Sequence, residues 1–169
     1  QLVFGPLSDH FGRIPVVRAG TLLFLLTSVL CALAADFGVM WAMRGLQGMA
    51  AASGPVIARA MVRDRYEGNR AAQVMSTLSA AMAIIPMIAP SIGALILQFA
   101  AWPAVFVALA VFAALVLAAL SRLPETASNT NNERLTLRMV LNSFSEMLRQ
   151  PSFLGYQMAG SFSFAALFV

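Results

Sequence analysis

Charged residues are scarce in this sequence. Asp, Glu, Lys and Arg make up 11% of its 169 residues, whereas 60% are hydrophobic. About a quarter of the residues in a soluble domain are charged, so an ordinary soluble protein is excluded. The longest uncharged run covers residues 71–121 and contains 51 residues. A helix crosses a bilayer with about 20 apolar residues, so this run is long enough for two crossings and a turn.

Cysteine is almost absent as well. Cys31 is the single cysteine, so no disulfide forms within the chain, and we expect it to act as a small apolar residue. The sequence contains no cluster with metal-ligand spacing, no glycine-rich phosphate loop and no nucleic-acid motif. We therefore expect no metal, no cofactor, no ATP-driven step, no nucleic-acid partner and no catalytic residues.

Both ends of the sequence fall inside apolar segments. The first residue is Gln1 rather than methionine, and the last stretch, SFSFAALFV, stops within an apolar run. We expect the chain to be a fragment of a longer membrane protein, and a missing start leaves the question of a signal peptide open.

The apolar runs predict an all-α, polytopic transmembrane helical bundle. Backbone amides in lipid must be hydrogen-bonded internally, and no segment alternates as a membrane strand would. Residues 1–8 are predicted to end one helix. Further helices are predicted at residues 15–35, 39–61, 71–99 and 104–120, and another starts near residue 153.

The charges fall on alternate connections between these helices. Ten of the eleven arginines belong to one side, which carries the loops at residues 9–15, 62–70 and 122–152. Because loops rich in Arg stay in the cytoplasm, we expect these three loops to be cytoplasmic. Asp36 and Trp102 mark the opposite side.

Residues 122–152 differ in composition from the rest. The beginning, RLPETASNTNNE, is polar and is typical of a flexible linker. Apolar residues then recur at helical spacing, at Leu137, Val140, Leu141, Phe144, Met147 and Leu148. This pattern predicts an amphipathic helix that either lies on the membrane surface or packs on the cytoplasmic ends of the spans.

The stretch GPLSDHFGRIP, residues 5–15, must reverse the chain at the mouth of an apolar segment. Gly12 offers the backbone freedom of a tight turn, Gly5 lets another helix come close, and Pro15 suits the first turn of a helix.

Asp9 can face the positive end of a helix or a nearby arginine. Arg59 and Arg63, on the cytoplasmic end of another helix, are its expected partners. Such a cluster would hold the cytoplasmic side shut in one state and break in another. The alternative is that Asp9 and Arg13 only set topology and cap a helix.

Arg44 is the one ionised residue inside a predicted span. An ionised side chain there is costly and normally faces the protein interior. Gln47, three positions on, lies on the same face, and Gly48 follows it. Together they indicate a wet cavity wall, whereas the alternative is that Arg44 extends outward to the membrane interface.

The helix at residues 71–99 contains Pro86 and Pro90, and each removes an amide donor. With Ala89, Gly93 and Ala94 they predict a thin, bendable helix with close contacts. Ordinary packing of small residues is the alternative.

Three stretches resemble signatures of the major facilitator superfamily. GPLSDHFGR resembles the G-x-L-a-D-r-x-G-r-k turn between the second and third helices, with matches at Gly5, Leu7, Asp9, Gly12 and Arg13. RGLQG resembles the R-x-x-Q-G signature of the fourth helix, with matches at Arg44, Gln47 and Gly48. APSIGA resembles the antiporter signature G-P-x-x-G-G, where Pro90 and Gly93 match and Ala89 and Ala94 replace glycines. His10 and Ile14 depart from the first signature.

Further stretches are similar to the bicyclomycin-resistance (Bcr/CflA) branch of drug:proton antiporters. These are ARAMVRDRYEG, RLPET and QPSFLGY, and the resemblance covers essentially the whole chain. It implies that residues 1–121 belong to an N-terminal six-helix bundle, that 122–152 connect two bundles, and that 153–169 begin the second bundle with a truncated seventh helix.

The resemblance also implies a function. It implies alternating access and proton-driven export of amphipathic drugs across a bacterial inner membrane, by a chain that is monomeric at full length. The implied cytoplasmic gate comprises Gly5, Asp9, Gly12, Arg13, Arg59 and Arg63. The implied substrate and proton pathway comprises Arg44, Gln47 and Gly48. The implied contact between the two halves comprises Pro86, Ala89, Pro90, Gly93 and Ala94.

Two other functions compete with drug export. One is transport of another small molecule, such as a metabolite or sugar, by the same superfamily. The other is a membrane enzyme or a non-transporting scaffold, which the absence of a catalytic cluster disfavours. No Asp or Glu lies deep in a predicted span, and the resemblance implies that the proton-binding carboxylate is on the first helix, outside this sequence.

Overall fold

Six helices account for most of the described part of the chain, which is residues 4–125, 155 and 158–159 of a computed structural model. Two compact units are distinguished, Gln1–Asn132 and Glu133–Val169, and all six helices belong to the first. No strand occurs among the described residues, so the predicted all-α fold is confirmed.

A single residue joins α1 (Phe4–Phe11) to α2 (Arg13–Leu33). This residue is Gly12, and its φ of 95° lies in the left-handed region that glycine adopts without strain. The predicted turn over residues 9–15 is therefore tighter than expected, because both helices run up to Gly12. Pro15 lies in the first turn of α2, as predicted, where its missing N–H forfeits no hydrogen bond.

Asp36 begins the next helix after a short turn. Its side chain accepts hydrogen bonds from the backbone N–H groups of Gly38 and Val39, at 3.0 and 3.2 Å. These bonds satisfy donors that the first turn of a helix leaves free. The helix α3 (Phe37–Ala51) accordingly starts two residues earlier than the sequence predicted.

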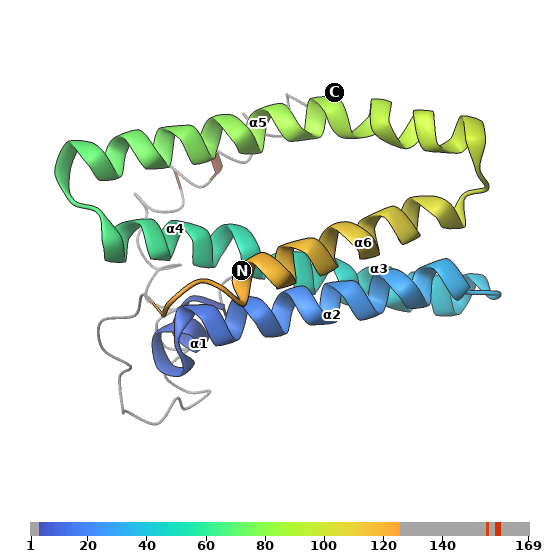
Figure 1. Cartoon of the computed structure of the whole chain (residues 1–169), viewed down its shortest axis with the longest axis horizontal. Coiled ribbons are helices and arrows are strands. Elements are labelled where there is room, and N and C mark those ends of the chain that lie inside the picture. Colours follow the sequence, from blue (N-terminus) through green and yellow to red (C-terminus); the bar gives the residue numbers. More distant parts are fainter. Residues whose placement is uncertain (1–3, 126–154, 156–157, 160–169) are drawn as a thin grey trace. The chain divides into compact units, whose positions relative to one another are not determined.

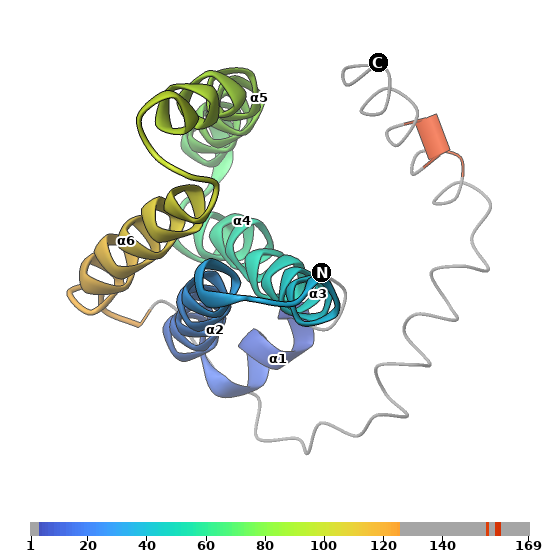
Figure 2. The same cartoon turned by 90° about the vertical axis from the view of Figure 1, so that its right-hand side faces the viewer.

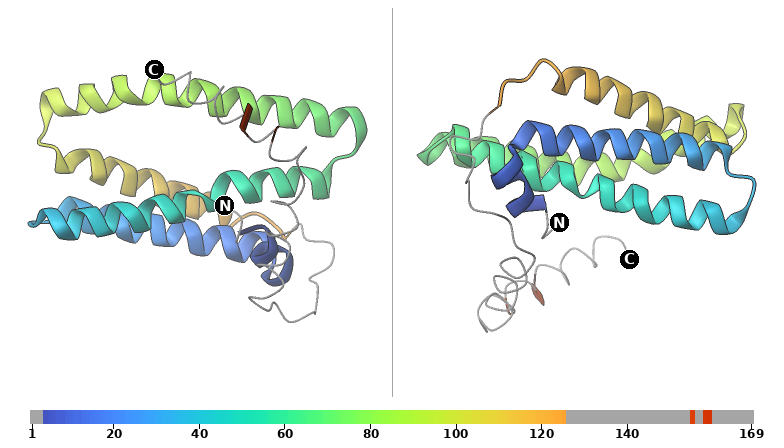
Figure 3. Two further views of the ribbon diagram at one scale, coloured as in Figure 1. Left: turned by 180° about the vertical axis from the view of Figure 1, so that it is seen from behind. Right: turned by 90° about the horizontal axis from the view of Figure 1, so that it is seen from below.

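A break at Ala52 separates α3 from α4 (Ser53–Arg65), so the single helix predicted over residues 39–61 was wrong. Pro55 explains the break, because proline cannot donate to the carbonyl four residues earlier, and that carbonyl belongs to Ala51. The backbone of Ala52 keeps helical angles, with φ −64° and ψ −20°. Figure 3 shows α4 continuing the course of α3.

The long uncharged run forms two helices, α5 (Gly68–Phe99) and α6 (Pro103–Leu120), as predicted. The charged loop before α5 is shorter than expected, because α4 extends to Arg65 and α5 starts at Gly68. Pro86 and Pro90 lie inside α5 without ending it. In Figure 1 the α5–α6 and α2–α3 connections lie at the right, and α1 and the α4–α5 connection lie at the left.

Among these helices α2 is central, because it packs against α1, α3, α4 and α6. Figure 2, which looks along the helices, shows α2 between α1, α3 and α6. Its core contact is formed by Val16 and Val17 with Ile57 of α4. Seven residues of α2 are buried, whereas α5, which contacts α4 and α6, has none.

Within the described residues, three helices are long and apolar enough to cross a membrane, namely α2, α5 and α6. The break at Ala52 divides the remaining predicted span into pieces of 15 and 13 residues. The amphipathic helix predicted after residue 133 lies outside the described residues. So does the helix predicted from residue 153, apart from the isolated helical residues Gly155, Met158 and Ala159.

Candidate functional site

Gly12 lies where only a glycine fits. A Cβ atom built on it would approach Glu125 Oε2 to 2.8 Å and Pro15 Cδ to 3.3 Å. The positive φ adds backbone strain for any other residue. The sequence prediction that Gly12 provides a turn is confirmed, and the space that it leaves open is taken by a carboxylate from far along the chain.

Arg13, the first residue of α2, links three helices through its guanidinium group. Its Nε donates to Asp64 Oδ2 of α4 at 2.8 Å, and its Nη1 donates to Ser8 Oγ of α1 at 2.7 Å. Nη1 also forms an ion pair with Asp9 of α1. Asp9 is 56% exposed and Asp64 only 21%, so the contact with Asp64 is the stronger one, because exposed ion pairs contribute little.

Glu125, which follows α6, binds the start of α2. Its Oε1 accepts from the backbone N–H of Arg13 at 2.9 Å, and its Oε2 accepts from that of Ile14 at 3.1 Å. The N-terminus of a helix carries a partial positive charge and free N–H donors, so a carboxylate is stabilised there. The residue that begins α2 thus contacts acidic side chains from α1, from α4 and from beyond α6.

Arg18 of α2 binds the end of α6, just as Glu125 beyond α6 binds the start of α2. Its Nε and Nη2 donate to the backbone carbonyl of Leu120, the last residue of α6, at 3.2 and 2.8 Å. A cation near the C-terminal carbonyls of a helix is favoured by the helix dipole. The partial positive charge at the start of α2 is therefore compensated by Glu125, which follows α6. The partial negative charge at the end of α6 is compensated by Arg18 of α2.

We name the group of Asp9, Arg13, Asp64 and Glu125 the arginine cluster. Arg13 and Asp9 were predicted to belong to a gate, but the expected partners of Asp9 are not observed. Neither Arg59 nor Arg63 forms an ion pair in the described part of the chain, and Arg59 Nη2 lies 3.8 Å from Met82 Sδ. Likewise, a Cβ built on Gly5 would meet nothing within 4 Å, so no close approach occurs there among the described residues.

Sequence reasoning missed Ser8, Asp64 and Glu125 as partners of Arg13. Two features of the sequence could have indicated Asp64 and Glu125. Asp64 lies in the charged stretch VRDRYEGNR, and Glu125 lies in RLPET, which carried part of the family resemblance. Their separations from Arg13, 51 and 112 residues, explain why no local pattern joined them.

The second group of polar residues lies inside α2 and α3. Arg44 Nη1 donates to Gln47 Oε1 at 2.7 Å, and Gln47 Nε2 donates to Ser28 Oγ at 2.6 Å. Ser28 in turn donates to the carbonyl of Phe24 at 2.7 Å. Gln47 and Ser28 are buried, at 2% and 0% exposure, so a buried chain of hydrogen bonds joins α3 to α2.

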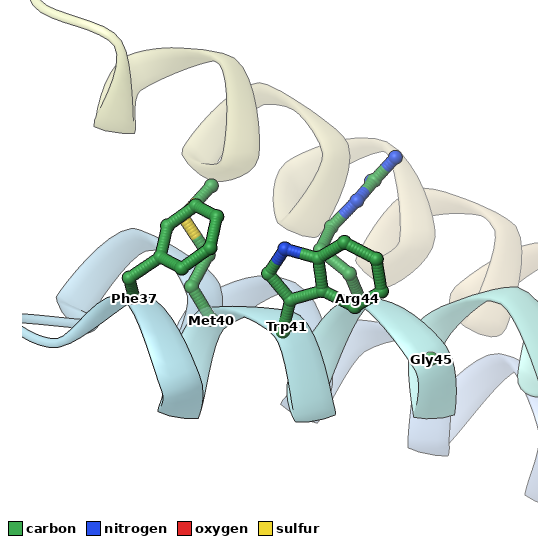
Figure 4. Close-up of a pocket in the computed structure, with 5 residues that line it drawn as sticks. All are labelled: Phe37, Met40, Trp41, Arg44 and Gly45. Atoms are coloured by element: carbon green, nitrogen blue, oxygen red, sulfur yellow. The ribbon is translucent and has the colours of Figure 1, made fainter.

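The guanidinium of Arg44 also lies over the ring of Phe106 in α6, with 5.7 Å between its Cζ atom and the ring centroid. A hollow of about 460 Å³ lies beside it, lined by residues that all belong to α3. These residues are Phe37, Met40, Trp41, Arg44 and Gly45. Figure 4 shows the side chains of Phe37, Met40, Trp41 and Arg44 projecting from one side of α3. Gly48, on the next turn, has nothing within 4 Å of a built Cβ.

The α5 signature lies apart from both polar groups. Ala89, Pro90 and Ala94 are exposed, and Pro86 and Gly93 are partly exposed. A Cβ built on Gly93 meets nothing within 4 Å. The close contacts predicted for this helix are not made within the described residues, and its role in coupling two halves stays a prediction.

Comparisons with known proteins point to one superfamily. The profile described as Major Facilitator Superfamily matches residues 1–169. The chain is 33% identical to a bicyclomycin resistance protein homolog of Haemophilus influenzae over 169 residues, which is 99% of this chain and 42% of the relative. It is 32% identical to the multidrug resistance protein MdtL of Citrobacter koseri over 149 residues, covering 85% of this chain and 38% of the relative.

A further relative is multidrug resistance protein D of Escherichia coli, which is 35% identical over 127 residues, covering 75% of this chain and 32% of the relative. The chain thus spans at most 42% of the length of these three relatives. The family match extends over every residue, and the described part is a bundle of helices that includes three of membrane-spanning length. The chain is a multi-pass membrane protein that belongs to the major facilitator superfamily.

Proposed function

We propose that this chain is part of a proton-coupled multidrug efflux transporter that exports amphipathic drugs across the bacterial inner membrane by alternating access. The names of its relatives support drug export, because they are a bicyclomycin resistance protein homolog and two multidrug resistance proteins. The proton gradient is the proposed energy source. The proposed partners are a small-molecule drug, protons and the surrounding lipid, and no catalytic step is involved.

The arginine cluster is the observation that carries the proposal. One side chain, Arg13, bridges α1, α2 and α4 within hydrogen-bonding distance, and Glu125 joins the same point from beyond α6. Charge-assisted hydrogen bonds that are partly exposed to solvent contribute about 1 kcal/mol or less each. A handful of such bonds is enough to favour one closed arrangement and yet can be exchanged during a transport cycle.

The position of the cluster fits a cytoplasmic gate. Arginine-rich connections stay on the cytoplasmic side of a membrane, and the cluster lies at the end of the bundle that carries the α1–α2 turn and the end of α4. Rocking of two helix bundles around a central site opens one side of a transporter while it closes the other. We infer that the cluster stabilises the state in which the cytoplasmic side is closed.

The test uses the full-length parent protein in cells that lack their own exporters. The cells are loaded with a fluorescent drug, and efflux is followed with and without an agent that collapses the proton gradient. We expect efflux to stop with the gradient. We expect Asp64→Asn and Asp9→Asn to slow it, with the larger effect at Asp64, which is the less exposed partner of Arg13.

Asp36→Asn is the matched control, because Asp36 caps α3 at the opposite end of the bundle, and asparagine caps a helix about as well as aspartate. Efflux that continues without a proton gradient would exclude proton coupling. If no drug in a broad panel moves although the protein is inserted and folded, drug export is excluded and another small-molecule substrate must be sought.

A further inference from the structure

The hydrogen bonds between α2 and α3 form a chain that runs in one direction. Arg44 Nη1 donates to Gln47 Oε1 at 2.7 Å, and Gln47 Nε2 donates to Ser28 Oγ at 2.6 Å. Ser28 Oγ in turn donates to the backbone carbonyl of Phe24 at 2.7 Å. Each donor therefore lies on the side of the guanidinium, and each acceptor lies on the side of the α2 backbone.

This direction is set at Ser28. A serine hydroxyl has one hydrogen to donate, and Ser28 gives it to the carbonyl four residues earlier in its own helix, at Phe24. Toward α3 its oxygen can then only accept a hydrogen bond. The side-chain amide of Gln47 has a donor group and an acceptor group, so it must turn its NH2 group toward Ser28.

The same orientation of the amide suits Arg44. A guanidinium group has only donors, so Gln47 binds it through the carbonyl oxygen. If the amide were turned over, a donor would face a donor at Arg44, and an acceptor would face an acceptor at Ser28. The hydroxyl of Ser28 therefore determines, through Gln47, whether Arg44 finds an acceptor.

Burial makes this chain hard to replace. Ser28 is 0% exposed and Gln47 is 2% exposed, so a polar group that loses its partner there bears the cost of desolvation. Thr27 is also buried, and its hydroxyl donates to the carbonyls of Leu23 and Phe24. Because both of these carbonyls belong to α2, Thr27 provides a matched comparison without a bond to α3.

We propose that Ser28 is a positioning residue for transport, whose hydroxyl orients the amide of Gln47 so that it holds the guanidinium of Arg44. Gln47 binds one edge of the guanidinium, and Phe106 of α6 lies against its face, at 5.7 Å from Cζ to the ring centroid. The proposal rests on the transport function proposed above. It adds to that function a buried residue of α2 that acts only through its neighbours.

The first test measures how firmly Arg44 is held. The full-length protein is prepared in lipid bilayers with isotope-labelled arginine, and the order of the guanidinium groups is measured by solid-state NMR. The signal of Arg44 is assigned by its loss in Arg44→Lys. We expect an ordered Arg44 in the parent protein and in Thr27→Val, and a mobile one in Ser28→Ala. Ser28→Cys fills the same space, but it should resemble Ser28→Ala, because a thiol is a weak acceptor.

The second test measures efflux by the full-length protein. Ser28→Ala should lower the efflux rate about 2- to 10-fold, as expected for one lost hydrogen bond, whereas Thr27→Val should leave it unchanged. In a Gln47→Leu background, Ser28→Ala should cause no further loss, because the chain is already interrupted. A purely structural role of Ser28 would lower the rate by the same factor in both backgrounds. Thermal unfolding verifies that each variant is folded.

The proposal is overturned if Arg44 stays ordered in both Ser28 variants, or if Thr27→Val makes it equally mobile. It is also overturned if Ser28→Ala slows efflux equally in the parent and in the Gln47→Leu background. Failure of the transport function is distinguishable from these outcomes. If only the Ser28 variants loosen Arg44 but the parent exports no drug, the positioning is supported and the function is overturned. Gradient-driven efflux with Arg44 ordered in every variant would do the reverse.

Discussion

The helices α2 and α5 are alike in sequence character and unlike in surroundings. Both are long, apolar and equally hydrophobic over a membrane-length window. Yet α2 packs on four neighbours and buries seven residues, whereas α5 buries none. Hydrophobicity thus indicates that a helix can cross a membrane, but it does not indicate what the helix packs against.

Small and polar residues of α2 take part in its close contacts beside the apolar ones. On α2, Gly20 lets α4 approach so closely that an added Cβ would collide with Ser53 Oγ, and Thr27 and Ser28 are buried. On α5, Gly93 and Thr77 have open surroundings among the described residues. Identical substitutions in the two helices should therefore have different costs, which three pairs of variants can measure in the full-length protein.

The largest expected difference is between Gly20→Ala and Gly93→Ala. At Gly20 the new methyl group collides with a buried serine, and overpacking of this kind costs about 1–3 kcal/mol. At Gly93 the change should leave stability unchanged or raise it, because alanine is the better helix former by about 0.5–1 kcal/mol. The unfolding temperature in detergent is the measurement. An equal loss at Gly93 would show that α5 packs closely on a segment outside the described residues.

The next pair compares the two helix starts. Glu125→Gln removes the charge that binds the first two N–H groups of α2, and we expect a loss of about 1 kcal/mol. Glu67 stands at the start of α5 and makes no side-chain hydrogen bond to it, so Glu67→Gln should cost at most a few tenths of a kcal/mol. The effect of each substitution on stability is measured as the shift of the unfolding midpoint at low and at high salt. Equal effects would mean that the contact of Glu125 with α2 contributes nothing to stability.

The smallest difference is expected between Thr27→Val and Thr77→Val. Each threonine hydroxyl donates to a carbonyl of its own helix. Thr27 is buried, at 2% exposure, and losing its bond should cost about 0.5–1.5 kcal/mol, whereas the exposed Thr77 should change stability by less than about 0.5 kcal/mol. Thermal unfolding of both variants measures the two losses of stability. A larger cost at Thr77 would contradict the picture of an uncovered α5.

Local patterns predicted much of the fold. Apolar runs predicted α2, α5 and α6, and Gly12 and Pro15 predicted the turn before α2. Asp9 was assigned to Arg59 or Arg63, although Arg13, four residues on in sequence, was the nearer partner across the turn. Pro55 was also present in the sequence as a sign of the break at Ala52, because a proline inside a helical pattern interrupts it.

Other contacts could not be read from local patterns. The partners of Arg13 on α4 and beyond α6 depend on how whole helices pack, and the same is true of the bond between Gln47 and Ser28. Nor does a glycine reveal whether a neighbour is close, as Gly20 and Gly93 show. Of the residues predicted to line a cavity, Arg44 lies beside the hollow, whereas Gln47 is buried and bonded to Ser28. The aromatic residues that line the hollow with Arg44 were not singled out.

The contact between Glu125 and the start of α2 also has a consequence for biosynthesis. The two partners are separated by 112 residues, and a ribosome adds about 5–20 residues per second. The start of α2 therefore waits between about 6 and 22 seconds for its carboxylate while the following helices are made. During that interval the turn at Gly12 is contacted first by α1 alone and then, once Asp64 has been made, also by α4, so its contact with Glu125 forms only after all six helices have been synthesised.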